Sequence, residues 1–203
     1  MIDKAASLHE LEWEILCRGP GMHKTDSDIA RYQWILDTVN PTVVIETGLY
    51  YGGSLLWFAE RVPRVITVEI DTQRIAEFET GKHKLGACPP NATIIAGNSH
   101  EVFGQVALLV RPSDIVMVSL DSDHDADTVY GEMIRYGKLV TPGSYMVTED
   151  AILEDWPVSP FPTSPLLAIN RYLAEHDDFE VDSELEDRWP TTQNPMGWLR
   201  RAS

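Results

Sequence analysis

Short apolar runs alternate with amphipathic stretches along most of this chain. The first amphipathic stretch has apolar residues at the spacing of one helical face, which predicts a helix over Asp28–Thr38 that ends at Asn40-Pro41. The β-branched apolar runs predict strands at Thr42–Thr47, Arg64–Ile70, Ala92–Ala96, Asp114–Leu120 and Ser144–Thr148. The amphipathic stretches that follow predict helices at Ser54–Arg61, Thr72–Thr80, Ser99–Val110, Ala126–Leu139 and Ser164–His176.

Strands separated by helices predict a parallel sheet with right-handed crossovers, which binds its ligands at the carboxyl ends of the strands. In the tail, Phe179–Leu185 and Gly197–Arg200 could form a closing antiparallel hairpin, and the proline-rich segment Ala151–Thr163 could cover the site. We expect one domain over residues 1–203. Residues 1–40 would be a helical segment and lid, residues 41–150 the binding core, and residues 151–203 the substrate side.

The charge of the chain restricts its partners. The 203 residues carry a formal net charge of −16, which repels phosphate backbones, so we expect no nucleic-acid partner. The chain begins without an apolar signal core and has no apolar run near the roughly 20 residues of a membrane span. Cys17 and Cys88 form no metal or redox motif. We therefore expect a cytoplasmic protein without membrane contact.

The first strand leads into a glycine-rich turn. The run Val43–Ile45 ends at Glu46, and Gly48-x-x-x-Gly52-Gly53 then departs from the Gly-x-Gly-x-x-Gly of dinucleotide sites. Glu69 ends the second strand 21 positions beyond Gly48, near the separation at which an acid holds ribose hydroxyls. Together they indicate a ribose-bearing cofactor without a pyrophosphate, and S-adenosylmethionine (SAM) fits best. The alternative is a structural turn with a surface glutamate.

Two later strands run into acidic residues. If these strands are neighbours, Asp121, Glu149 and Asp150 converge at the carboxyl edge, where three carboxylates repel one another unless a cation joins them. All-oxygen ligands suit magnesium, manganese or calcium. Adjacent strand residues point to opposite faces, so Glu149 and Asp150 can share an ion only if the strand bends there. The alternative is that these acids cap loops.

His124 lies three residues beyond Asp121. A histidine at such a site could accept a proton from an acceptor hydroxyl, because its ordinary pKa lies near the working pH. A lone histidine in a polar loop can equally be a solvated side chain.

These motifs carry a family resemblance. The chain resembles the cephalosporin hydroxylase/rhamnosyl O-methyltransferase family of class I SAM-dependent methyltransferases, and more distantly catechol O-methyltransferase. The shared pattern covers most of the chain. It runs through Lys24, Asp28, Tyr32-Gln33, Ile45–Ser54, Leu120–His124, Leu139–Tyr145 and Asn194–Arg201.

The resemblance implies a Rossmann-like methyltransferase fold, with a mostly parallel seven-stranded sheet, a C-terminal antiparallel hairpin and helices on both faces. It also implies roles for particular residues. Glu69 would hold the cofactor ribose. The turn with Glu46, Gly48, Tyr51, Gly52 and Ser54 would surround its methionine portion, and Ser99 and His100 would border its adenine. Asp121, Glu149 and Asp150 match the metal-binding acids, and His124 stands where the catechol enzymes carry a catalytic lysine.

We interpret the chain as an O-methyltransferase that uses SAM and Mg²⁺ (or Mn²⁺). Its acceptor would be a hydroxylated small molecule such as a sugar, an antibiotic precursor or another natural product, and the resemblance suggests a homo-oligomer. One rival is a metal-dependent glycosyltransferase, because Asp121-Ser122-Asp123 is an Asp-x-Asp signature. Another is a non-catalytic scaffold that binds the cofactor. An iron-dependent hydroxylase, which needs two histidines and a carboxylate, ranks lower.

Overall fold

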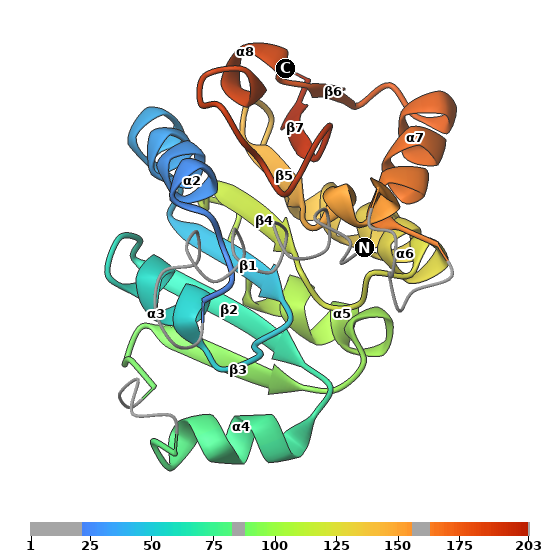
Figure 1. Ribbon diagram of the computed structural model, residues 1–203. Helices are drawn as coiled ribbons and strands as arrows, with labels where there is room; N and C mark the ends of the chain where they lie inside the picture. The colour runs from blue at the N-terminus through green and yellow to red at the C-terminus, as the bar shows by residue number, and fades with distance from the viewer. Residues whose placement is uncertain (1–21, 83–87, 156–162, 203) are drawn as a thin grey trace, which may run out of the picture.

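The strands of the chain form one twisted sheet. The computed structural model describes residues 22–82, 88–155 and 163–202. Within these residues seven strands are ordered β3-β2-β1-β4-β5-β7-β6 (Figure 1). They are β1 Val43–Thr47, β2 Arg64–Glu69, β3 Ala92–Ala96, β4 Val116–Leu120, β5 Tyr145–Thr148, β6 Phe179–Val181 and β7 Trp198–Arg201. Strands β1 to β5 pair in parallel, whereas β7 runs antiparallel to both β5 and β6. The predicted fold class, including the closing hairpin, is confirmed.

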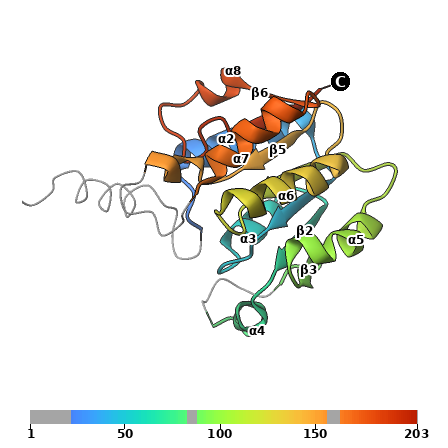
Figure 2. The ribbon, with the colours of Figure 1, turned by 90° about the vertical axis from the view of Figure 1, so that its right-hand side faces the viewer.

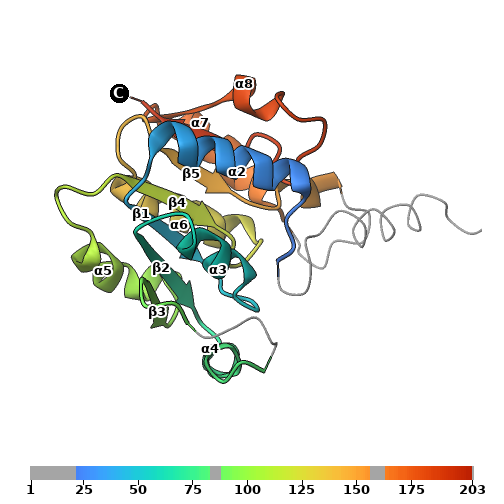
Figure 3. The same cartoon turned by 90° about the vertical axis from the view of Figure 1, so that its left-hand side faces the viewer.

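Helices cover both faces of this sheet. One face carries α2 Asp26–Val39, α3 Gly53–Ala59, α4 Thr72–Glu79 and α8 Ser183–Glu186. The other carries α5 Ser99–Leu109, α6 Ala126–Tyr136 and α7 Pro165–Glu175, which stand in front of the sheet in Figure 2. The opposite view in Figure 3 shows α2 and α3 in front. Short 3-10 helices follow α6 (Gly137–Leu139) and β5 (Ala151–Asp155).

Coverage on both faces explains why the central strands are apolar without strict alternation. Every residue of β1 is buried. Val43 and Ile45 pack with the α5–α6–α7 layer, whereas Val44 packs with the α2–α3 layer. Alternate side chains of the strand thus pack into two separate apolar cores, one on each face of the sheet.

Helix α2 has defined ends and a buried charged residue. The Thr25 hydroxyl accepts a hydrogen bond from the Asp28 backbone N–H, and Asn40 ends the helix in a left-handed conformation. Arg31 is fully buried and donates to the backbone carbonyls of Leu185 and of the loop that follows α8. These bonds fix the C-terminal loop against α2.

The structure refines the predicted tail. Strand β6 ends at Val181 rather than Leu185, because the Asp182 carboxylate accepts a hydrogen bond from the Leu185 N–H and caps α8. Most of the predicted cover, residues 156–162, lies outside the described residues. Among the described helices, none combines the length and the hydrophobicity of a membrane span.

Candidate functional site

A cleft of about 950 Å³ opens at the carboxyl ends of the central strands. After β1 the chain proceeds outward to β2 and β3 and then returns to β4 on the other side of β1, so the strand order reverses there. Ligands of open α/β sheets bind at this switch point. The lining includes Met22, His23, Lys24, Gly48, Leu49, Tyr50, Ser54, Glu69, Ile70, Arg74, Ser99, Asp121, Ser122, Asp123, His124, Thr128, Asp150 and Leu153.

The glycine-rich turn after β1 has an unusual backbone. Gly48, Tyr50 and Gly52 all have positive φ, at 90°, 50° and 87°. A Cβ on Gly48 would lie 2.0 Å from the Asp121 carbonyl oxygen, and one on Gly52 would meet the Phe78 ring. Glycine is required at both positions, because its missing side chain permits the conformation and the close approach.

Glu69 holds this turn in place from the end of β2. Its carboxylate accepts hydrogen bonds from the backbone N–H groups of Leu49 (3.0 Å), Tyr50 (3.3 Å) and Asp71 (2.8 Å). The side chain is buried yet lines the cleft. The next residue, Ile70, is 65% exposed in the same cleft, which leaves an apolar surface ready for a flat ligand.

The other predicted cofactor residues lie around the turn. Ser54 and Ser99 line the cleft, whereas Glu46 is buried and accepts a hydrogen bond from Thr67. Burial raises the pKa of Glu46 to about 8, although the charge of Lys24 opposes this shift. Tyr51 stacks on Tyr50, and the His100 ring bonds the Thr128 carbonyl. Neither Tyr51 nor His100 is part of the cleft lining, and their cofactor roles stay predictions.

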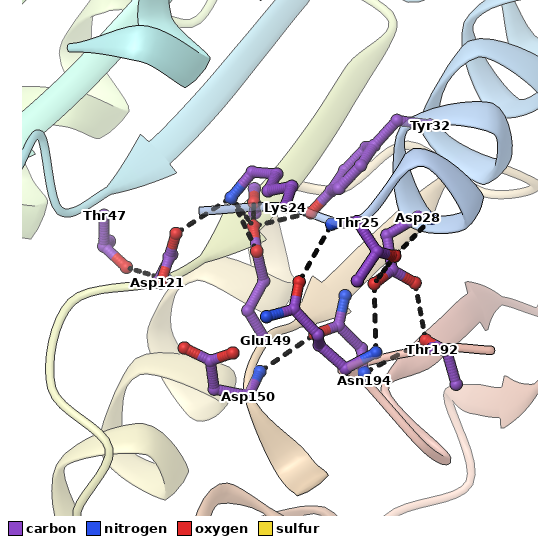
Figure 4. A network of polar contacts seen from close by, with 12 residues as sticks. Lys24, Thr25, Asp28, Tyr32, Thr47, Asp121, Glu149, Asp150, Thr192 and Asn194 are labelled. Atoms are coloured by element: carbon purple, nitrogen blue, oxygen red, sulfur yellow. Dashed lines mark hydrogen bonds and ion pairs between the residues drawn. The ribbon is translucent and has the colours of Figure 1, made fainter. Parts of the chain in front are cut away.

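Lys24 is the residue whose role was missed. Its ammonium lies 2.6 Å and 2.7 Å from the Glu149 carboxylate oxygens and 2.9 Å from Asp121 Oδ2 (Figure 4). Glu149 also accepts hydrogen bonds from the hydroxyls of Tyr32 and Ser119. Burial by itself lowers the pKa of Lys24, but Asp121, Glu149 and Glu46 outweigh this effect and hold that pKa well above its usual value. The side chain is therefore a buried cation.

Asp121, His124 and Asp150 form a second group beside this contact. Each offers a ligand atom, and these atoms all lie within 4.8 Å of one another. His124 Nε2 is 3.4 Å from Asp150 Oδ2. Burial lowers the pKa of His124, while burial and the charges of Asp121 and Glu149 raise the pKa of Asp150 well above its usual value. The group combines a neutral imidazole with carboxylates that repel each other, which suits a divalent cation.

A buried acid beneath the cleft ties three strand-end loops together. Glu132 of α6 is fully buried and accepts hydrogen bonds from Ser122 (2.7 Å) and Thr47 (3.2 Å), and from Ser99 as well. Ser122 follows β4, Thr47 ends β1 and Ser99 follows β3. One carboxyl group therefore connects the ends of three strands beneath the cleft. Burial raises the pKa of Glu132 to about 7, and the hydroxyl donors partly offset that shift.

The contact between Gly48 and Asp121 generates a first prediction. Gly48→Ala should destabilise the protein by roughly 2–4 kcal/mol, because it combines backbone strain with a clash against a carbonyl. Gly81→Ala is the control, since Gly81 also has positive φ but has open space around its Cα. That variant should lose only about 1–2 kcal/mol. Urea unfolding measures both, and equal losses would contradict the importance of the contact.

Glu132 generates a prediction about pH. Because its folded pKa lies above the unfolded value of about 4.5, this residue stabilises the fold most at low pH, and that contribution is lost as pH rises toward about 7. Glu132→Gln should therefore gain stability relative to wild type by on the order of 2–3 kcal/mol between pH 5 and pH 8. Urea unfolding at each pH measures the gap. The exposed Glu101→Gln is the control, and a constant gap for Glu132→Gln would refute the assignment.

The chain matches a known protein family over most of its length. The family model described as Rhamnosyl O-methyltransferase/CmcI matches residues 14–202. Curated rhamnosyl O-methyltransferases from Mycobacterium tuberculosis are 32% identical over 184 residues, which cover 88% of this chain and 74% of theirs. The one from Mycobacterium leprae is 33% identical over 187 residues, with 88% and 79% covered.

Solved structures show the same fold. CmcI with magnesium and SAM has a TM-score of 0.64 at 22% identity, covering 90% of this chain and 74% of that one. The O-methyltransferase TomG from Streptomyces achromogenes, in complex with SAM, has a TM-score of 0.58 at 20% identity, with 87% and 78% covered. The family match over nearly the whole chain and the curated O-methyltransferase relatives agree, and the chain belongs to the rhamnosyl O-methyltransferase/CmcI family of O-methyltransferases.

Proposed function

We propose that this protein transfers a methyl group from SAM to a hydroxyl of a small metabolite and that it requires a divalent cation. The main support is that two features line the same cleft. One is the glycine turn after β1, which Glu69 holds in place, and the other is the group formed by Asp121, His124 and Asp150 after β4 and β5. The names of the mycobacterial relatives make a sugar hydroxyl the first acceptor class to test.

The cofactor half of the cleft fits SAM. A carboxylate has about four lone-pair directions, and Glu69 uses three of them for backbone amides, which leaves one for a ribose hydroxyl. Ile70 would cover one face of the adenine, and Ser99 would stand at its edge. The absence of a side chain at Gly48 allows the methionine portion to approach the backbone.

The metal half of the cleft fits a divalent cation by the chemistry of its donors. Asp121 and Asp150 would supply two carboxylates. Two residues are candidates for the third ligand. Glu149 is predicted from the sequence, and His124 has a ring nitrogen within 4.8 Å of the ligand atoms of Asp121 and Asp150. The ion pairs of Lys24 with Asp121 and Glu149 support the fit, because these two acids already accept a buried positive charge.

The residues of the cleft would act mainly by positioning. When bound, SAM supplies an electrophilic methyl on its sulfonium, and a divalent cation supplies positive charge that favours the deprotonated form of an acceptor hydroxyl. Glu69 and the turn would orient the cofactor, and Lys24 would keep Glu149 and Asp121 fixed. His124, if it is not a ligand, would accept the acceptor's proton at a ring nitrogen. Holding both reactants in line should account for much of the acceleration.

The rivals predict other ligands. A glycosyltransferase would bind a nucleoside diphosphate sugar and would leave the Glu69 turn without a role. A scaffold would bind SAM without transfer to any acceptor. The identity of the bound ligand separates the glycosyltransferase from the proposal, and methyl transfer to an acceptor separates the scaffold from it.

Ile70 provides the test for the cofactor. Ile70→Ala should weaken SAM binding about 5- to 30-fold, since roughly 1–2 kcal/mol of apolar contact with the adenine would be lost. Calorimetric titration measures the affinity. Leu108→Ala is the control, because Leu108 is 86% exposed and lies outside the cleft lining. Equal affinities in the two variants would show that the adenine does not rest on Ile70, and binding of a nucleotide sugar instead of SAM would favour the glycosyltransferase.

The metal requirement is tested by methyl transfer from labelled SAM to rhamnose-containing and other hydroxylated acceptors. Transfer should stop in EDTA and return with Mg²⁺ or Mn²⁺. Asp121→Asn should impair that return by at least about 100-fold, because it removes a ligand. The exposed Asp177→Asn should behave like wild type. Full activity in EDTA would exclude a required metal, and SAM binding without transfer to any acceptor would favour the scaffold.

A further inference from the structure

We propose that Gln193 and Asn194 are positioning residues for methyl transfer, because they fix the side of the cleft that faces the methyl acceptor. Neither residue lines the cleft. The proposal rests on the proposed function and goes beyond it, since it gives a role to the Asn194–Gly197 motif, which that function leaves unused. The side concerned, the acceptor wall, consists of cleft residues outside the cofactor half, namely Met22, His23, Lys24, Asp150 and Leu153.

The two residues hold the chain that follows β5. The Asp150 N–H donates a hydrogen bond to Asn194 Oδ1 at 2.9 Å, and the Ile152 N–H donates to the Gln193 carbonyl at 3.0 Å. Asp150 has a φ of 57°, which residues other than glycine rarely adopt, so a fixed partner for its N–H favours this conformation. The same bonds set the course of the chain into Leu153, the next residue of the acceptor wall.

Gln193 also holds the segment before α2. Its Oε1 accepts a hydrogen bond from the Thr25 N–H at 3.0 Å, and its own N–H donates to the Asp28 carboxylate at 3.0 Å. All three residues are buried. Because Thr25 directly follows Lys24, the Oε1 contact determines where Lys24 enters the cleft. Both parts of the acceptor wall, before α2 and after β5, are thus tied to Gln193 (Figure 4).

The turn after Asn194 holds this residue against the end of β5. The Gly197 N–H donates to the Asn194 carbonyl at 2.8 Å, and the Gly197 carbonyl accepts from the Thr148 N–H at 2.9 Å. A Cβ on Gly197 would lie 2.1 Å from the Thr148 carbonyl oxygen, so this position requires glycine. The turn therefore gives Asn194 a single place relative to β5.

The contacts of the two amide side chains are made by their oxygens. Nε2 of Gln193 and Nδ2 of Asn194 are buried and have no hydrogen-bond partner among the described residues. A buried donor without a partner does not stabilise a fold, so the role of each side chain lies in its oxygen. A variant that keeps the oxygen and changes the nitrogen can therefore separate positioning from packing.

Gln193→Met provides the test, because it removes Oε1 and nearly keeps the size of the side chain. The kcat/KM for the methyl acceptor, measured with labelled SAM, should fall at least about 10-fold, since small displacements of a reactant are costly. The Kd of SAM should stay within about 3-fold by calorimetry, because Glu69 holds the glycine turn from β2. The control is Gln105→Met on the exposed side of α5, which should match wild type in both measurements.

Gln193→Glu is the conservative variant. Burial beside Asp28 favours its neutral carboxyl group, whose carbonyl oxygen can accept the hydrogen bond from Thr25. This variant should recover most of the kcat/KM that Gln193→Met loses. Equal losses in the two variants, or a SAM affinity that falls in parallel with kcat/KM, would show that the side chain only supports the fold, and the inference would be overturned.

A second readout needs no methyl transfer. In wild type the buried Lys24 amine should resist acylation by an amine reagent, with the exposed Lys138 as internal reference. Gln193→Met should raise the rate of Lys24 acylation at least about 10-fold by mass spectrometry, since the segment before α2 loses its contact through Thr25. Gln105→Met should keep Lys24 protected.

The two readouts separate this proposal from the proposed function. An unchanged acylation rate in Gln193→Met would show that Gln193 does not position Lys24. If wild type transferred methyl to no acceptor, the proposed function would fail, and the acylation rates would still decide whether Gln193 fixes the segment. If Gln193→Met did not fold, Asn194→Ala, which removes the side-chain contact to Asp150, should show the same split between kcat/KM and SAM affinity, and its absence would overturn the inference.

Discussion

The buried contact of the Lys24 ammonium with Glu149 and Asp121 is the interaction on which the cleft depends. It joins the segment before α2 to the ends of β5 and β4, which are 125 and 97 positions away in the chain. Met22 and His23 thereby become part of the cleft wall. Removing one partner would leave an uncompensated charge in the interior, which typically costs about 3–5 kcal/mol. We therefore expect Lys24 to stay paired with Glu149 and Asp121 in the folded protein. This pairing fixes the position of the segment before α2 relative to the ends of β4 and β5, and so determines the shape of the cleft.

The fold was predictable because its signals are local. The apolar runs at Val43–Ile45 and Val116–Leu120 are strands covered on both faces, and the glycines between strand and helix fix the direction of the turn. One tail element was missed for an equally local reason. Asp182 caps a four-residue helix, and this competes with a strand pattern that continues to Leu185. The Asp182 cap determines that β6 ends at Val181 and that α8 begins, and the apolar pattern alone does not predict this boundary.

The site was predictable only in part. Glu69 and Asp121 follow from the rule that ligands gather where parallel strands end, and both line the cleft. Lys24 has no local pattern that ties it to Glu149, because their contact forms only when the sheet is assembled. The directions of Glu149 and Asp150 depend on one backbone angle, which the residue types do not specify. The sequence does not single out Ile70, because a single exposed apolar side chain is common on any surface.

The approach of Gly48 to the Asp121 carbonyl leaves no room for a side chain between the cofactor half and the metal half of the cleft. The two halves therefore behave as one mechanical unit, and neither can be reshaped without displacing the other. A substitution at Gly48 or Asp121 would therefore disturb both the cofactor half and the metal half of the cleft. Divergence among relatives that act on different acceptors should then concentrate away from it, at wall positions such as Met22, His23 and Leu153, which can change while the contact of Lys24 with Glu149 is kept.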